Sequence, residues 1–453
     1  MTATINLDSS LPVWSGIPFI GLLLSLALLP LFAPRFWKKN YYYVVAAWAL
    51  VLALPFLWYF GQSAGHEIAR MVLLDYLPFM ILLLSLFAVA SGIYVEGALK
   101  GTPFTNVIML FIGTVIASWI GTTGASMLLI RPMIRTNARR KNKTHIIIFF
   151  IFLVSNIGGS LTPLGDPPLF LGFLRGVPFF WTFSLLPVTA FISGLCLTIF
   201  FILDTFYYRL EKHHLPHLEE SHLDAGLRLR GGHNFIYLGG IIAAVLFSGI
   251  ADLGEAVFMG VALPVQDIIR DFILLALTAL SMATTAKKIR AANQFCWHPM
   301  LEVAIVFAAI FVTILPVLAM LRAGRDGHLA FITNAAQAPW HYFWITGLLS
   351  SFLDNAPTYL TFLTTALGNF LNGLPEHEAV LKLISGHPVI LQAISAGAVF
   401  MGANTYIGNA PNFMVRAIAE ESGVKMPSFF GYMAWSLFIL VPLFILATLV
   451  FFA

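Results

Sequence analysis

The sequence predicts an all-α polytopic membrane protein made of two inverted repeats. Each repeat is expected to hold five transmembrane helices and one re-entrant hairpin, with discontinuous helices at the membrane midplane. Composition is the first reason: 59% of the 453 residues are hydrophobic and 10% are charged, whereas charged residues make up about 25% of a soluble domain. Apolar runs of about twenty residues, long enough to cross hydrocarbon as helices, are the second reason.

Two polar motifs that contain Gly and Pro interrupt the apolar sequence, and they are the third reason. Residues 159–168 read Gly-Ser-Leu-Thr-Pro-Leu-Gly-Asp-Pro-Pro, and residues 402–411 read Gly-Ala-Asn-Thr-Tyr-Ile-Gly-Asn-Ala-Pro. Gly, Thr, Gly and Pro recur at offsets 0, 3, 6 and 9 of both motifs, and Asp166 corresponds to Asn409. Interrupted segments at matching places in two halves indicate the midplane site of a transporter built from repeats.

Basic residues set the expected orientation. Lys and Arg cluster in residues 35–39, 131–143 and 287–290, and basic loops lie on the cytoplasmic side. We therefore expect an integral protein of the plasma (inner) membrane with its N-terminus outside. The first ten residues contain no Lys or Arg, so a cleavable signal peptide is not indicated and the first span is expected to stay.

The first repeat is predicted over residues 1–204. Spans are expected at about 11–33, 41–60 and 72–93. Residues 105–130 lie between two cytoplasmic flanks, so we predict a re-entrant hairpin with its tip at Thr122 and Thr123. A broken crossing at 145–175 and a return span at 178–203 follow. Residues 205–233 are polar and rich in His, which indicates a cytoplasmic linker.

The second repeat is predicted over residues 234–453. Spans are expected at about 234–251, 257–283 and 299–321, a hairpin at 340–372, a broken crossing at 388–415 and a last span at 428–452. The hairpin tip is placed at Asp354 and Asn355, and a loop with Glu376 and Glu378 is expected to follow. Five crossings per half is an odd number, so the second half must be inverted relative to the first.

Four polar breaks are therefore predicted to meet at the midplane: two hairpin tips and two helix breaks. Broken helices expose carbonyl groups that suit Na⁺ and positive N-terminal dipole ends that suit anions. The residues expected to bind the ion or substrate are Asp166, Asp354, Asn355, Thr358, Thr162, Asn404, Thr405, Asn409, Thr122, Thr123 and Asn156. Asp354 and Asp166 are the Na⁺ candidates. Placing a carboxylate at membrane depth costs about 2.5–3.5 kcal/mol, so such a residue is usually there for a function.

Simpler interpretations remain open for several of these residues. Asp166 precedes two prolines, so it is placed to cap a helix, and Asp354 is placed similarly before Asn-Ala-Pro. Arg175 and Arg416 follow the breaks and are expected to set topology, to screen anions or to pair with a carboxylate. Glu302 is expected near the interface, in a snorkelling or structural role.

Other classes of function are disfavoured. Cys196 and Cys296 lie in or beside apolar runs, so no disulfide framework is indicated. The tract with His213, His214 and His217 has no firm metal-ligand spacing and is interpreted as solvated linker. No nucleic-acid partner is expected, since topology explains the basic clusters. The chain lacks a His-Glu-x-x-His motif, and no enzyme activity or cofactor is expected.

The motifs resemble those of the ion transporter superfamily, over nearly the whole chain. Residues 155–168, with Ser-Asn-Ile-Gly-Gly and Gly-Asp-Pro-Pro, are similar to an element of citrate-transporter-like and antiporter members, and residues 354–358 resemble the superfamily's hairpin tip. The resemblance implies secondary transport by an elevator-like movement, often as a homodimer. The tips differ from the Ser-Asn-Thr signature of divalent-anion members, which weakens a dicarboxylate interpretation.

The leading hypothesis is a Na⁺/H⁺ antiporter in which Asp354 and Asp166 exchange Na⁺ for protons. Thr162, Thr405, Asn355 and Asn409 would supply neutral oxygen ligands. The alternative is a symporter of citrate or another organic anion, with or without a bound metal, and an arsenite or anion permease is a third hypothesis. The expected partners are the lipid bilayer and a small inorganic ion or organic anion, with Na⁺ or H⁺ as coupling ions.

Overall fold

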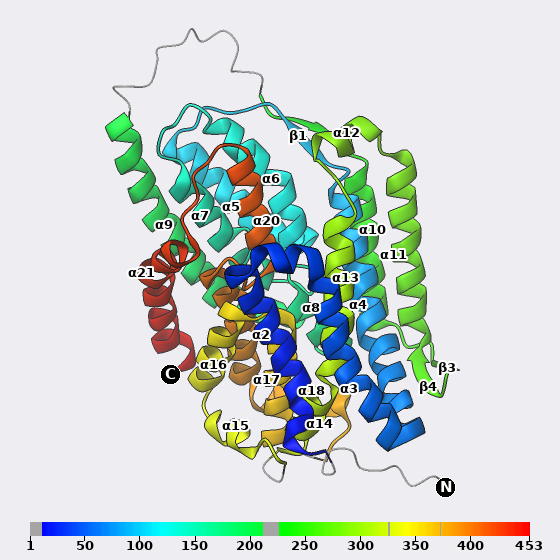
Figure 1. Ribbon diagram of the computed structural model, residues 1–453. Helices are drawn as coiled ribbons and strands as arrows, with labels where there is room; N and C mark the ends of the chain where they lie inside the picture. Colours follow the sequence, from blue (N-terminus) through cyan, green and yellow to red (C-terminus); the bar gives the residue numbers. More distant parts are fainter. Residues whose placement is uncertain (1–10, 212–225, 325–326, 372) are drawn as a thin grey trace.

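The computed structural model describes residues 11–211, 226–324, 327–371 and 373–453, which are mostly helical (Figure 1). Two groups of helices pack side by side. The flanking group, on the right of Figure 1 with α2 in front, consists of α2 (Ile17–Phe32), α3 (Pro34–Met71), α4 (Leu77–Ala90), α10 (Asn234–Ile250), α11 (Val265–Thr284) and α13 (His298–Thr313). The π-helical turn η2 (Val72–Tyr76) joins α3 to α4 and belongs to this group.

The core group contains the segments that the sequence analysis assigns to the two hairpins and the two broken helices. It consists of α5 (Pro103–Ile120), α6 (Thr122–Thr136), α7 (Thr144–Leu153), η3 (Ile157–Ser160), α8 (Pro167–Leu174), α16 (Pro339–Phe352), α17 (Asn355–Phe370), α19 (Pro388–Met401), η7 (Gly402–Asn404) and α20 (Ala410–Glu421). The pair α5–α6 lies in the upper half of Figure 1, and the pair α16–α17 lies in the lower half. All four breaks fall where the sequence predicts them.

Further elements connect and cover the two groups. The helices are η1 (Val13–Gly16), η4 (Phe179–Leu185), α9 (Leu186–Glu211), α12 (Lys287–Ala292), α14 (Leu315–Arg322), α15 (Ala330–Ala335), α18 (Glu376–Gly386), α21 (Phe429–Ala447) and η8 (Thr448–Phe452). Two antiparallel strand pairs are present among the described residues. They join β1 (Tyr94–Glu96) to β2 (Arg228–Arg230) and β3 (Glu255–Phe258) to β4 (Val261–Pro264).

Helix α7 shows where the hydrophobic core lies. Its sequence is apolar on every face, and each residue from His145 to Leu153 is buried, as expected for a helix that is hydrophobic all round. At its start, buried Asp204 of α9 lies 2.7 Å from His145 Nε2, accepts a hydrogen bond from Asn106 at 2.9 Å and pairs with Arg140 at 2.5 Å. These contacts fix the starts of α5 and α7 against α9.

Several predicted boundaries are wrong. The helix that contains the span predicted at 41–60 begins earlier, at Pro34, and Gly61 at φ 53° separates it from the helix that leads into the span predicted at 72–93. The span predicted from residue 257 starts at Val265, because β3 and β4 precede it. The expected loop with Glu376 and Glu378 is helix α18. The predicted linker begins later, since α9 continues to Glu211, and His213, His214 and His217 lie outside the described residues.

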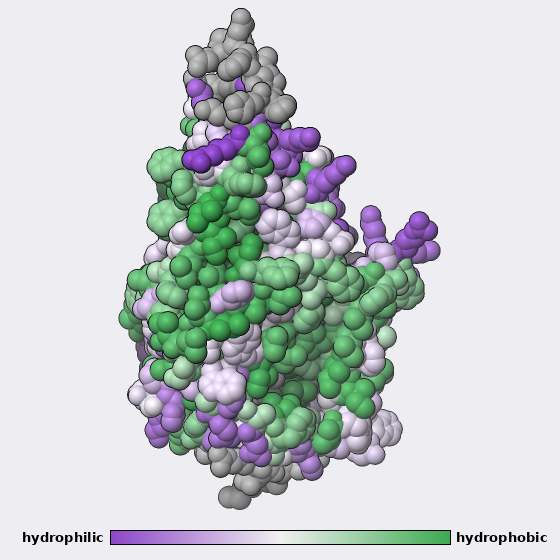
Figure 2. Space-filling view, turned by 90° about the vertical axis from the view of Figure 1, so that its left-hand side faces the viewer, coloured by the Kyte–Doolittle hydropathy of each residue, from purple (hydrophilic) through white to green (hydrophobic). Residues whose placement is uncertain are grey.

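One face of the molecule is apolar across its middle. Figure 2 shows a broad hydrophobic face on the side formed by α9 and α21, with hydrophilic residues gathered toward the two ends. By length and composition, five helical stretches of the described chain could cross a membrane, or up to seven if each of two bent helix pairs is one span. The shorter apolar helices at Thr144–Ser160 and Asn234–Ile250 fall below that length, which accounts for part of the difference from the predicted crossings.

Candidate functional site

Four half-helices begin around one buried carboxylate. Asp166 occupies the N-cap position of α8, and its side chain is 1% exposed. Its Oδ1 accepts hydrogen bonds from Thr122 Oγ1 at 2.9 Å and Asn409 Nδ2 at 3.2 Å, while its Oδ2 accepts one from Asn355 Nδ2. Thr122 and Asn355 are the first residues of α6 and α17, and Asn409 is the N-cap residue of α20. We call these four residues the Asp166 centre.

The Asp166 centre joins both hairpin tips and both helix breaks. Each of the four helices starts there, so each directs its positive dipole end toward the carboxylate. Among the described residues, the hydrogen-bond partners of the carboxylate are all neutral. The four helix starts and the three neutral donors therefore offset only part of the cost of burying this carboxylate, and no paired cation among the described residues balances its charge.

The interpretation of Asp166 as a helix cap alone is wrong. Its side chain makes no capping hydrogen bond, because Pro167 and Pro168 follow it and proline has no backbone N–H. The prolines start α8 and leave the carboxylate to the other three elements. Ser, Thr or Asn could cap a helix as well as Asp does. A side chain that receives hydrogen bonds from three neutral donors must instead supply acceptor oxygens, as a carboxylate does.

The threonines of the two motifs fold the breaks rather than contact Asp166. Thr162 Oγ1 donates to Ser118 O and accepts from Leu164 N. Thr405 Oγ1 donates to Ser351 O at 2.5 Å and accepts from Gly408 N at 3.1 Å. In both motifs the hydroxyl therefore ties the break to the end of the preceding hairpin helix, α5 or α16.

Asp354 does cap a helix. Its Oδ1 accepts a hydrogen bond from Ala356 N at 3.1 Å at the start of α17, and its backbone oxygen accepts from Thr358 Oγ1 at 2.9 Å. The residue is half-buried. One carboxylate oxygen is used in the cap, and capping does not prevent the side chain from contacting a cation.

Substitution of Asp354 separates its two roles. We expect Asp354→Ala to lower stability by about 1 kcal/mol through loss of the cap, measured as a fall in melting temperature. Asp354→Ser keeps a capping oxygen and should restore most of that stability, but it removes the carboxylate. If Asp354 takes part in ion exchange, Asp354→Ser stays defective in transport. Normal transport by this variant would limit Asp354 to capping.

Asparagine side chains form a second layer behind the Asp166 centre. Asn409 Nδ2 also lies 3.2 Å from Asn156 Oδ1, and Asn156 Nδ2 donates to Asn412 Oδ1 at 2.7 Å. Asn412 Nδ2 in turn donates to Gly402 O at 2.8 Å and Thr405 O at 2.9 Å. This chain holds the second break against the first one.

Two amide oxygens near the breaks have no hydrogen-bond partner among the described residues. They are Asn355 Oδ1, on a fully buried side chain, and Asn404 Oδ1. Asn404 Nδ2 donates to Ser351 Oγ at 2.9 Å. Buried polar atoms are normally paired, and neutral oxygens of this kind are ligands that a hard cation accepts.

The structure brings part of the predicted set of site residues together. Thr122, Asn355, Asn409 and Asp166 are in direct contact, and Asn156 adjoins them. Thr123 is half-buried and makes no side-chain hydrogen bond to a described residue. Among the described residues, no group of three or more His, Cys, Asp or Glu side chains is placed to hold a metal ion.

Ser118 and Asn412 support the site but are not among the residues that the sequence predicts. Ser118 Oγ donates to Gly158 O and accepts from Leu161 N at 3.0 Å, so it supports the first break as Ser351 supports the second. Ser118 lies four positions before the predicted tip at Thr122, and Ser351 lies three positions before the tip at Asp354, so a small polar residue near each tip was the available signal. Asn412 directly follows Pro411, but nothing in its local sequence indicates a partner as distant as Asn156.

The arginines after the breaks pair with carboxylates. Arg175 pairs with Asp75 and Glu376, and Arg416 pairs with Glu420 at 2.9 Å. The alternative of carboxylate pairing is therefore correct for both. Neither arginine is bonded to Asp166.

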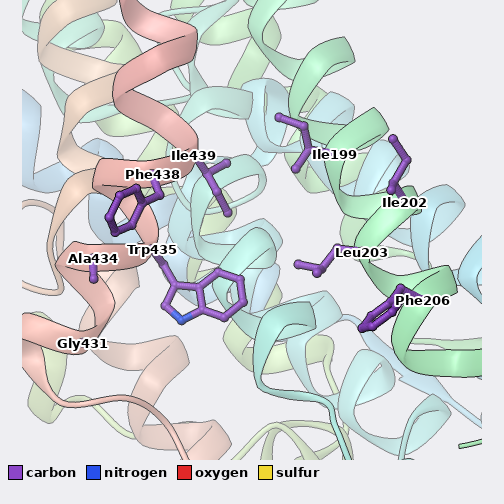
Figure 3. A pocket seen from close by; sticks show the side chains of 9 residues that line it. All are labelled: Ile199, Ile202, Leu203, Phe206, Gly431, Ala434, Trp435, Phe438 and Ile439. Carbon is purple, nitrogen blue, oxygen red and sulfur yellow. The ribbon is translucent and has the colours of Figure 1, made fainter. Parts of the chain in front are cut away.

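A separate groove of about 620 Å³ lies between α9 and α21 on the hydrophobic face. Figure 3 shows the residues that line it, which are Ile199, Ile202, Leu203, Phe206, Gly431, Ala434, Trp435, Phe438 and Ile439. It holds no charged side chain and is distinct from the Asp166 centre.

Comparison with known proteins gives one family. The family described as "Putative citrate transport" matches residues 8–452, almost the whole chain. A comparison with curated proteins finds no match. The resemblance to the ion transporter superfamily is confirmed, since this family is one of its members. Together with the apolar spans, the match identifies the chain as a multi-pass membrane transporter that belongs to the family of this description.

Proposed function

We propose that the protein is a Na⁺/H⁺ antiporter and that Asp166 is the group that exchanges a proton for Na⁺. The observation that carries this proposal is the environment of Asp166, a buried carboxylate with three neutral hydrogen-bond partners. A buried acid without a paired cation must take up a proton or a metal ion when its charge is not balanced. Competition between the two for one carboxylate couples their movements in opposite directions.

The oxygens around the carboxylate support Na⁺ as the ion. Asn355 Oδ1 and Asn404 Oδ1 lack partners within the described chain, and half-exposed Asp354 lies next to Asn355. Carboxylate and amide oxygens are hard ligands that suit hard cations. No Lys, Arg or His of the described residues is bonded to Asp166, so the centre lacks the charge-assisted donors that bind carboxylate substrates tightly.

We further propose that the two halves are inverted repeats with re-entrant hairpins and that the N-terminus lies outside. The proposal is supported by paired features of the two breaks. Thr162 and Thr405 make equivalent bonds to the ends of α5 and α16, and the two hairpins occupy opposite halves of the structure (Figure 1). We also propose that the protein forms a homodimer and has no resident cofactor.

A second candidate is symport of citrate or a related organic anion with Na⁺ or H⁺. The family description favours it. The start of four helices at one point also favours an anion, because helix N-termini attract negative charge. In this alternative Asp166 binds the coupling ion and the substrate lies beside it.

Reconstituted protein distinguishes the two functions. Proteoliposomes loaded with a pH-sensitive dye should show proton movement when a Na⁺ gradient is applied and little accumulation of labelled citrate. Citrate uptake that depends on Na⁺ or on a pH gradient would support the symporter, provided that Na⁺ drives no proton movement when citrate is absent. That result would contradict the antiporter. Current without any coupling would contradict both.

A further inference from the structure

A cluster of five charged side chains lies at the end of α8 opposite the Asp166 centre. We call Arg70, Asp75, Arg175, Arg322 and Glu376 the ion-pair cluster. Arg175 Nη2 lies 3.3 Å from Asp75 Oδ1, and Arg175 Nη1 bonds Glu376. Glu376 Oε2 also lies 3.4 Å from Arg322 and 4.0 Å from Arg70. The cluster lines a cavity of about 470 Å³.

The ion-pair cluster connects the two helix groups. Arg70 and Asp75 belong to α3 and η2 of the flanking group, whereas Arg175 is the C-cap residue of α8 in the core group. Glu376 is the first residue of α18, which leads into α19 of the core. Asp75 and Arg175 are both about nine-tenths buried, so their pairing is screened little by solvent.

In its other close contacts with the flanking group, α8 contributes uncharged side chains. Gly249 of α10 leaves room for Phe173, whose ring atoms lie 2.9 Å from where a Cβ on that glycine would be. Arg270 of α11 stacks over the ring of Phe170 at 5.9 Å. Helix α8 therefore depends on Arg175 for its ionic connection to the flanking group.

The interface between the groups is different on the side of α6 and α20. There Phe87 of α4 and Met300 of α13 pack with Met127 of α6, and Met414 of α20 adjoins them. Methionine side chains adapt readily to changed surroundings. These apolar contacts are less directional than the ion pairs around Arg175.

We propose that the ion-pair cluster is a latch that holds the core group in the observed conformation and must open in each transport cycle. The inference depends on the proposed transport function, because a carrier has to alternate the access of its site. Directional charged contacts break in one step when α8 shifts by a few ångströms, since salt bridges need oxygen and nitrogen within about 4 Å. The methionine-containing interface of α6 and α20 with the flanking group permits that shift.

Cross-linking tests the latch directly. In protein with Cys196→Ala and Cys296→Ser, the pair Asp75→Cys and Arg175→Cys is joined by a short bifunctional thiol reagent that reduction removes. We expect transport to stop when the link forms and to return, relative to the unlinked variant, after reduction. Full transport by the linked protein would overturn the proposal.

A labelling assay tests the latch without using transport. Leu174 lines the same cavity, and the rate at which Leu174→Cys reacts with a maleimide reports opening. Asp75→Asn and Arg175→Gln should each raise this rate on the order of tenfold. Unchanged rates in both single variants would contradict the latch.

Glu378→Gln is the matched control, because Glu378 pairs with Lys382 at 2.8 Å within α18 and both side chains are exposed. This variant should leave the labelling rate unchanged, and a change equal to that of Asp75→Asn would count against the latch. If the wild-type protein moves neither Na⁺ nor citrate, the proposed function fails, while the labelling rates still decide whether the latch exists.

Discussion

Asp166→Asn is expected to reduce Na⁺-driven proton movement by about 100-fold or more, which corresponds to about 2.7 kcal/mol at 1.36 kcal/mol per decade. The variant keeps the size of the side chain but cannot release or bind a proton. It also turns one acceptor oxygen into an NH₂ donor. Because Thr122, Asn355 and Asn409 all donate to Asp166, at least one of them would then face another donor.

The measurement is dye-reported proton flux in proteoliposomes at equal protein content. Asp252→Asn serves as the control, since Asp252 is an exposed carboxylate beyond α10, and it should behave as the wild type. Wild-type flux in Asp166→Asn would contradict the assignment of Asp166 as the exchanging group. Loss of flux together with loss of folded protein would call for Asp166→Glu as a second variant, which should retain proton exchange in part.

Gly165→Ala is expected to destabilise the protein by about 3 kcal/mol, at the upper end of the range for overpacking. A Cβ at this position would lie 2.2 Å from Gly159 O and 2.9 Å from Ser118 Cα. Both neighbours are backbone atoms, so no side-chain rotation relieves the clash. The first break would have to open, and Thr122 N would lose its 2.8 Å hydrogen bond to Gly165 O.

Melting temperature in detergent measures this effect. Gly194→Ala is the matched control because it lies inside helix α9, and nothing lies within 4 Å of an added Cβ. Alanine is favoured over glycine in a helix by roughly 0.5–1 kcal/mol, so the control should be at least as stable as the wild type. Equal melting temperatures for Gly165→Ala and the wild type would show that the first break is not closely packed.

The sequence was sufficient to locate the breaks and the central residues. The repeated spacing of Gly, Thr and Pro marks both helix breaks, and basic flanks mark the first hairpin. The breaks that carry Thr122, Asn355 and Asn409 were predicted to meet the break that carries Asp166, and the structure brings these residues into hydrogen-bond contact. Local patterns succeed here because each break is encoded by residues that lie close together in the chain.

Other contacts between distant segments were not predicted. The pairing of β1 with β2 joins the segment after α4 to residues within the predicted linker, and strands of three residues leave little periodicity in the sequence. The pairing of Arg175 with Asp75 and Glu376 likewise depends on tertiary packing. Helix α18 could have been recognised, because acidic residues Glu376 and Glu378 follow Pro375 in a first helical turn.

The most direct test of the central claim is proton release when Na⁺ binds to purified protein in weakly buffered solution. The exchange account predicts that adding Na⁺ to the wild type releases about one proton per bound ion, as expected when a metal displaces a proton from its ligand. Asp166→Asn should release none. Na⁺ binding without proton release in the wild type, or equal release by Asp166→Asn, would contradict the assignment of exchange to Asp166.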